Sequence, residues 1–136
     1  MAILVGVQGD AWAPEMHYVQ GTGLYHVYFT MRQKFGKPAI GVATAPDPFG
    51  PFTDLGAPLS TRGSCQGVLD STYFKDPISG KSFLAWRYNG LCYAKIEIQE
   101  MEPDGLTFKQ GSEPQTLLVS QPGDEFSIEA PWFVYR

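Results

Sequence analysis

Residues 24–45 read LYHVYFTMRQKFGKPAIGVATA, and this stretch decides the fold class of the 136-residue chain. The run Leu24–Met31 is dense in aromatic and β-branched residues, which favour extended strands. The run Pro38–Ala45 predicts another strand close behind it. No stretch of a dozen residues shows the apolar spacing of a helix without a Gly or Pro interrupting it. We therefore predict an all-β chain.

The segments on either side extend these two strands into a four-strand unit. A short run over Glu15–Gln20 precedes the glycine-containing turn 21–23, which predicts a hairpin with residues 24–31. The proline-rich loop 46–51 follows the next strand, and Phe52–Leu55 is expected as a short edge strand. The predicted order is therefore three strands joined by turns and a fourth, short strand at the edge.

The same order occurs a second time along the chain. The second unit is predicted to have strands over residues 68–75, 81–88, 91–99 and 106–109. A third unit is expected to open with a strand over Ile128–Tyr135. A repeated unit of four antiparallel strands is typical of the blades of a β-propeller.

Composition and charge narrow the function classes. Hydrophobic residues make up 43% and charged residues 18%, which excludes disorder driven by charge. The net charge of −4 and the lack of a basic cluster exclude binding to a nucleic-acid backbone. The apolar start Met1–Val7 lacks the length of a signal or membrane-spanning segment, so we expect no membrane partner and leave the localisation open.

The cysteines and histidines support no specific chemistry. Cys65 and Cys92 are too few for a disulfide scaffold, and the sequence leaves open whether they pair or are two buried thiols. His17 and His26 lie on consecutive predicted strands without further ligands nearby in the sequence. No metal site is predicted from them.

Acidic residues stand near the start of the first strand of each unit. Glu15, Asp70 and Glu129 follow one another at separations of 55 and 59 residues. In a propeller the first strand of each blade lines the central channel, so this spacing predicts that the three side chains face one shared cavity.

The neighbours of two of these acids suggest a functional role. Glu129 lies between Ile128 and an apolar run, which predicts a buried carboxyl with a raised pKa, as an acid catalyst needs. Asp70 lies within an apolar strand. The alternatives are an ordinary surface glutamate for Glu129 and a strand-end cap on backbone amides for Asp70.

The order of several short motifs resembles glycoside hydrolase family 43, over about residues 11–136. WAPEMHYV (12–19) resembles the opening of that family's second blade, and IGVATA (40–45) with GPFTD (50–54) resembles its end. VLD (68–70) is similar to the opening of the third blade, and EAP (129–131) to that of the fourth.

The resemblance implies a single domain over residues 1–136 that forms part of a five-bladed β-propeller, about two and a half blades of four antiparallel strands. Blade two is expected over about 12–59, blade three over about 67–110, and the start of blade four over about 115–136. It also implies an inverting glycoside hydrolase acting on arabinofuranosyl or xylosyl linkages of plant polysaccharides. The family divides among several substrates through its loops, so the particular glycoside stays open.

Residue by residue, the resemblance assigns catalytic roles to two acids and substrate contacts to three other residues. Glu129 matches the general acid, with Ala130 after it where the family commonly has Gly. Asp70 matches the aspartate that orients this acid and tunes its pKa. The expected substrate-binding residues are Trp12, Glu15 and Trp132, since tryptophan faces stack on sugar rings. Trp86, in the middle of a predicted strand, is expected in the core.

An inverting glycosidase also needs a second carboxylate, about 6.5–9.5 Å from the acid, to activate water. In the family this general base is an aspartate of the first blade, and nothing in residues 1–11 matches it. Asp10 lacks the proline that should follow. We therefore expect an incomplete or inactive fragment. The alternatives are a non-catalytic carbohydrate-binding propeller fragment and a structural piece without a function of its own.

Partners and cofactors follow from the same resemblance. The expected partner is an arabinose- or xylose-containing oligosaccharide or polysaccharide, and no cofactor is implied beyond a possible axial cation in the complete propeller. Since about two blades cannot close a ring, exposed blade faces predict a homo-oligomer. A sister clan with the same propeller ranks lower, because its acid motif is Glu-Cys-Pro rather than the EAP of residues 129–131.

Overall fold

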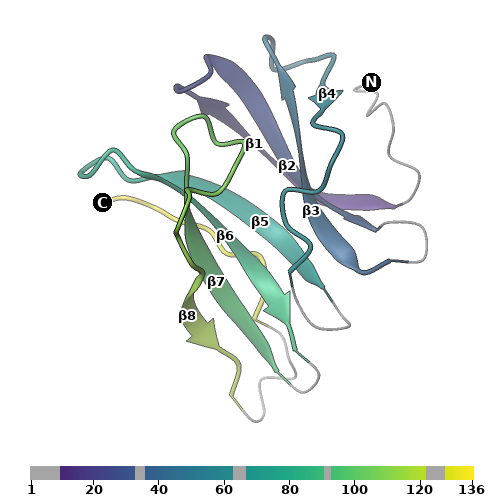
Figure 1. Ribbon diagram of the computed structural model, residues 1–136, viewed down its shortest axis with the longest axis vertical. Helices are drawn as coiled ribbons and strands as arrows, with labels where there is room; N and C mark the ends of the chain where they lie inside the picture. Colours follow the sequence, from purple (N-terminus) through teal and green to yellow (C-terminus); the bar gives the residue numbers. More distant parts are fainter. Residues whose placement is uncertain (1–9, 33–35, 63–66, 91–92, 122–127) are drawn as a thin grey trace.

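The computed structural model describes residues 10–32, 36–62, 67–90, 93–121 and 128–136. Within these ranges the chain is all-β, without helices, and forms two four-stranded antiparallel sheets (Figure 1). No helical segment of the described ranges has the length and hydropathy to span a bilayer. Cys65 and Cys92 lie outside the described residues.

Each sheet is a meander in which neighbours in the sequence are neighbours in the sheet. The first sheet consists of β1 (Ala11–Val19), β2 (Leu24–Arg32), β3 (Pro38–Ala45) and β4 (Thr53–Asp54). The second consists of β5 (Val68–Lys75), β6 (Ser82–Asn89), β7 (Ala94–Met101) and β8 (Gln115–Val119). The predicted all-β class with repeated four-strand units is confirmed, and β3 and β5 have the predicted bounds.

The fourth strand of the second sheet differs from the prediction. It was expected over Leu106–Lys109, but Phe108 makes only an isolated bridge to Met101, and β8 pairs with β7 instead. The intervening loop is folded by its own turns, in which the Gly105 N–H donates to the carbonyl of Glu102. Residues 115–119, expected at the start of the next blade, therefore complete the second sheet.

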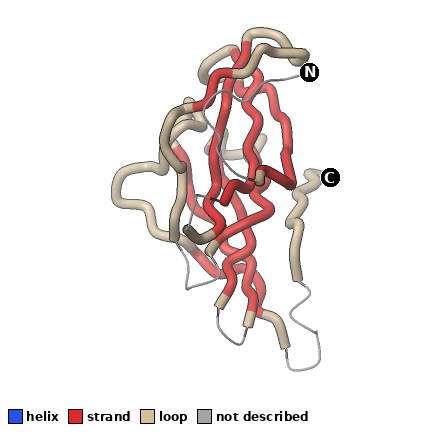
Figure 2. The backbone as a smooth tube through the Cα atoms, turned by 90° about the vertical axis from the view of Figure 1, so that its right-hand side faces the viewer, coloured by secondary structure: helices blue, strands red, loops and turns tan. Residues whose placement is uncertain are grey.

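The strand expected over residues 128–135 is also absent from the structure. This segment lies beside the second sheet rather than along one of its edges (Figure 2), and the ring of Phe133 lies 5.3 Å from that of Phe74 on β5. A segment that covers the face of a sheet contacts it through side chains, not through backbone hydrogen bonds. Residues 128–136 therefore pair with no strand among the described residues.

The two sheets pack on one another through a shared apolar core. Tyr28 on β2 and Tyr73 on β5 stack with their ring centroids 5.7 Å apart, and Tyr28 Oη donates to the carbonyl of Gly105 at 2.8 Å. Trp86, expected in the core, is completely buried in the same cluster. This packing brings the start of β1 beside the start of β5.

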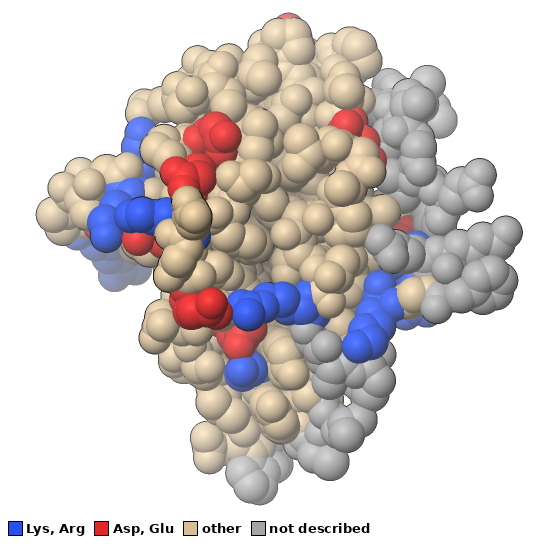
Figure 3. Space-filling model, in the orientation of Figure 1, with Lys and Arg blue, Asp and Glu red and all other residues tan. Residues whose placement is uncertain are grey.

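The charged residues do not form a single-sign surface on the face shown in Figure 3. Acidic and basic side chains are interspersed there, with broad uncharged areas between them. On β8, Leu118 is 60% exposed, which leaves an apolar edge uncovered. The expected homo-oligomer stays a prediction.

Candidate active site

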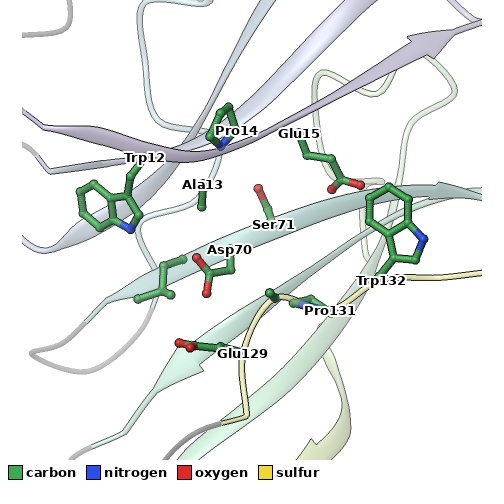
Figure 4. A pocket seen from close by; sticks show the side chains of 11 residues that line it. Trp12, Ala13, Pro14, Glu15, Asp70, Ser71, Glu129, Pro131 and Trp132 are labelled. Atoms are coloured by element: carbon green, nitrogen blue, oxygen red, sulfur yellow. The ribbon is translucent and has the colours of Figure 1, made fainter.

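A pocket of about 480 Å³ opens between the starts of β1 and β5 and the segment 128–136 (Figure 4). The structure brings together here all the site residues predicted from the sequence. The pocket is lined by Trp12, Ala13, Pro14, Glu15, Leu69, Asp70, Ser71, Glu129, Ala130, Pro131 and Trp132.

Three residues of this pocket share an unusual backbone conformation. Ala13, Asp70 and Ala130 have φ values of 48°, 54° and 50°, and they are the non-glycine residues with positive φ among those described. An L-residue in this region costs about 1–2 kcal/mol, although aspartate tolerates it better than most. Such strain is concentrated at functional sites, so its recurrence around one pocket supports a site there.

On β1 and β5 the residues with positive φ, Ala13 and Asp70, lie in β-bulges. The pairing register shifts between Trp12 and Glu15 in β1, and between Leu69 and Thr72 in β5. Glu15 therefore takes the place that Thr72 has in the next sheet, and Ala13 takes the place of Asp70, although Glu15 and Asp70 both stand near the start of a first strand. Counting residues along the chain could not reveal this, because a bulge re-aims side chains without changing the spacing between repeats.

Glu15 is bound to both sheets. Its Oε1 accepts a hydrogen bond of 2.9 Å from the Thr72 hydroxyl on β5, across the interface. Nε2 of His17 also lies 2.9 Å from Glu15 Oε1, but without the alignment of a hydrogen bond. This carboxylate is fixed at the wall of the pocket.

Asp70 is held at both its backbone and its carboxylate. Its N–H donates to Oγ1 of the buried Thr30 at 3.0 Å, and its carboxylate accepts from the Ala130 N–H. Burial and, next, the charge of Glu129 raise the pKa of Asp70, while the Ala130 N–H and the Arg87 cation partly oppose this rise. The two acids are therefore electrostatically coupled.

Glu129 has a different setting from the buried one expected. Its side chain is 56% exposed, so the expectation of burial is wrong. Oε2 accepts a 2.5 Å hydrogen bond from Nη1 of Arg87, whose side chain is only 15% exposed. The apolar neighbours misled the prediction, because residues 128–136 cover a sheet face with their outer side open to solvent.

The tryptophans lie at opposite sides of the pocket, with Asp70 and Glu129 between them (Figure 4). Trp12 is half-buried, and the guanidinium of Arg32 lies 5.9 Å from its ring centroid. Trp132 is 69% exposed. Aromatic faces placed in this way can stack on the apolar face of a sugar ring.

The comparison with known sequences decides the family. The sequence profile of the glycosyl hydrolases family 43 matches residues 4–136. The chain belongs to this family.

Relatives and solved structures agree with this family 43 assignment. The arabinan endo-1,5-alpha-L-arabinosidase C of Emericella nidulans is 29% identical over 132 residues, which are 93% of this chain and 38% of that protein. A thermostable family-43 glycoside hydrolase is 27% identical with a TM-score of 0.68, over 82% of this chain and 36% of that one. An endo-arabinase from Bacteroides thetaiotaomicron has a TM-score of 0.70 at 23% identity, over 86% and 40%. The chain therefore spans well under half of each of these proteins.

Some residues of the family 43 site were not predicted from the sequence. Arg87 gave no local signal, because its place beside Glu129 depends on the pairing of β6 with β5. Pro14 and Pro131 could have been found from the sequence, since each follows an alanine in a repeated Ala-Pro pair.

The family resemblance implied a possible axial cation in the complete propeller. In the part of the chain that the structure describes, no three His, Cys, Asp or Glu side chains gather as metal ligands would.

The raised pKa of Asp70 predicts how stability depends on pH. We expect Asp70→Asn to raise the melting temperature at pH 7, because burial and the charge of Glu129 disfavour the ionised form of the wild-type carboxyl group. The folded state binds this proton more tightly than the unfolded one, so the gain should shrink as pH falls through the raised pKa. It should vanish below the ordinary value of 3.8, where both states are protonated. Asparagine also tolerates the positive φ.

Asp76→Asn provides a control of opposite sign. The side-chain hydrogen bond from Ser79 and the Ile78 N–H lower the pKa of Asp76, so its ionised form stabilises the fold. This variant should be less stable than wild type at pH 7, and the loss should disappear in acid. Melting curves from pH 3 to 7 test both variants, and a loss of stability at pH 7 in Asp70→Asn would contradict the assigned electrostatics.

Proposed function

We propose that this family 43 chain supplies the acid side of an inverting glycosidase site for arabinofuranosyl or xylosyl linkages. The observation that carries the proposal is the placing of Asp70 and Glu129 in one pocket, between two tryptophans and beside strained backbone. The family and the order of its motifs support the reaction class.

In the proposed reaction Glu129 is the general acid. It donates a proton to the leaving glycosidic oxygen as the bond from that oxygen to the anomeric carbon breaks. Asp70 acts as a positioning residue. Its carboxylate accepts a hydrogen bond from the N–H of Ala130, the residue that follows Glu129, and so fixes the backbone next to the acid. Burial and the charge of Glu129 raise the pKa of Asp70, so the two carboxyl groups influence one another electrostatically.

The other half of an inverting reaction needs a base that activates water on the opposite face of the sugar. The remaining carboxylate among the described pocket residues is Glu15, which already accepts a hydrogen bond from Thr72. We assign Glu15 to substrate contact and propose that the described residues hold no base. The name of the Emericella nidulans relative favours an arabinofuranosyl substrate over a xylosyl one.

Azide tests this assignment because it needs no base. It attacks the anomeric carbon from the face opposite the leaving group, while the leaving oxygen takes the proton of Glu129. The products are an alcohol and a glycosyl azide of inverted configuration. We expect the chain to cleave an alkyl α-L-arabinofuranoside or β-D-xyloside faster with azide than without it, with the inverted glycosyl azide identified by nuclear magnetic resonance.

The same protein can be used to test the alternative, a non-catalytic carbohydrate-binding role. Binding of arabino- or xylo-oligosaccharides, measured by calorimetry, without cleavage in either condition would replace the proposal with a non-catalytic carbohydrate-binding role. A retained configuration would contradict the inverting geometry. The absence of both binding and cleavage would refute both functions.

A further inference from the structure

Thr30 is a polar residue in the apolar interface between the two sheets, and the reaction proposed above does not use it. It lies on β2 and is completely buried, and its Oγ1 accepts the Asp70 N–H at 3.0 Å. Its partner on β3 is Ile40, a completely buried member of the shared core. A hydroxyl in such a place costs free energy unless it makes hydrogen bonds. Its hydrogen bond to an acid of the candidate active site therefore points to a role beyond packing.

This hydrogen bond connects the bulges of the two sheets. Thr30 pairs with Trp12, the last paired residue of β1 before the register shifts, and Asp70 lies in the bulge of β5. The φ of 54° at Asp70 is sparsely populated in proteins and persists only where surrounding contacts fix it. The Thr30 hydroxyl is such a contact, because it accepts the N–H of the strained residue itself.

Arg87 has the corresponding place in the second sheet. It pairs with Leu69 just before the bulge of β5, as Thr30 pairs just before the bulge of β1. Thr30 reaches across to Asp70 in the next unit of the chain. Arg87 likewise reaches across to Glu129 in the segment that follows its own sheet. The second strand of each sheet thus supplies one side chain that holds an acid of the pocket in the next unit.

We propose that Thr30 is a positioning residue of the candidate active site, which holds the strained backbone of Asp70 so that the carboxylate reaches the Ala130 N–H. The inference rests on the proposed function, since it extends the series of contacts that ends at the general acid. Without the hydroxyl, the Asp70 N–H loses its acceptor in a buried place. The backbone can then relax out of the bulge conformation, which aims the side chain elsewhere.

Thr30→Val tests the proposal because valine has the shape of threonine but cannot accept a hydrogen bond. With the alkyl arabinofuranoside and azide, kcat should fall about tenfold to a hundredfold while KM changes little, as expected when a catalytic group is slightly displaced. A 2,4-dinitrophenyl glycoside needs no acid, so its cleavage should be nearly unchanged. Thr30→Ser keeps the hydroxyl and should restore most of the lost rate. A merely structural role would lower the rates with both glycosides alike.

The titration of Asp70 gives a second readout, which needs no substrate. Burial and the charge of Glu129 raise the pKa of this carboxyl group in its present position. In Thr30→Val its chemical shift, followed by nuclear magnetic resonance, should report a pKa closer to the ordinary value, because the side chain leaves that position. Thr30→Ser should keep the wild-type pKa. Thr30→Ala, which also lacks the hydroxyl but is smaller, should behave as Thr30→Val does.

Ser82→Ala is the matched control. Ser82 is also buried in the interface and its hydroxyl lies 2.8 Å from that of Tyr73, but it pairs with Lys75 at the far end of β5. This variant should lower stability, since it removes a buried hydrogen bond. The ratio of the two cleavage rates and the titration of Asp70 should stay as in wild type.

An unchanged titration of Asp70 in the variants without the hydroxyl would overturn the proposal. Equal losses with both glycosides, or the same changes in Ser82→Ala, would overturn it as well. If wild type cleaves neither glycoside, the proposed function is wrong, and the titration still decides whether Thr30 holds Asp70 in place.

Discussion

Glu129→Gln is expected to lower the azide-dependent cleavage of an alkyl arabinofuranoside by about 100- to 10,000-fold, the usual contribution of a general acid. An alkoxide is a poor leaving group and needs the proton that Glu129 supplies, which an amide cannot provide. Glutamine retains an oxygen that can accept from Arg87 Nη1, so the segment should keep its place on the second sheet. Initial rates of alcohol release measure the effect.

The leaving group separates a loss of acid catalysis from a loss of binding. A 2,4-dinitrophenyl glycoside departs without protonation, so Glu129→Gln should cleave it nearly as fast as wild type. Glu113→Gln is the matched control, because Glu113 is also an exposed glutamate paired with an arginine, Arg62, but lies outside the candidate active site. An equal loss on both substrates would show that Glu129 does not act as the acid.

Loss of Arg87 is expected to lower the rate of azide-dependent cleavage less than Glu129→Gln does, because Arg87 acts only by holding Glu129 in position. Its side chain is mostly buried on β6, while Glu129 belongs to a segment without strand partners among the described residues. The ion pair is thus a principal contact described for the Glu129 carboxylate. This relation explains how an acid carried by a non-strand segment is held over the second sheet.

The sequence was enough to predict that the site residues lie close together, because their positions follow from the repeated four-strand unit. Once the strands at 38–45 and 68–75 were recognised, the repeat predicted that Glu15, Asp70 and Glu129 face one cavity, and the structure has them in one pocket. Aromatic and β-branched runs indicate strands locally, so this part required no tertiary information.

The features that the sequence did not reveal depend on contacts between elements. The exposure of Glu129 is set by how residues 128–136 cover the second sheet, and an apolar neighbourhood in the sequence does not report it. The bulges in β1 and β5 appear only in the pairing register. Likewise, β8 is exposed along its length, so no buried face distinguished it from the preceding loop.

A comparison of two tryptophans should separate folding from function. Trp86→Ala is expected to lower the free energy of unfolding by about 3–5 kcal/mol, as truncation of a buried aromatic side chain usually does. The Trp86 ring is fully buried against Phe108, and its Nε1–H donates to Glu97 Oε2 at 3.2 Å. Its removal leaves a cavity between the sheets and takes a donor from a buried carboxylate. Urea denaturation measures the loss.

Trp132→Ala removes the same side chain from the wall of the pocket and should give the reverse pattern. Because Trp132 is 69% exposed, the free energy of unfolding should change by less than about 0.5 kcal/mol. Affinity for an arabino- or xylo-oligosaccharide should fall about threefold to tenfold, since the ring no longer stacks on the sugar. Calorimetric titration measures this fall. Unchanged affinity with lowered stability would show that Trp132 serves the packing of residues 128–136, and the pocket would then lose one of its two proposed sugar platforms.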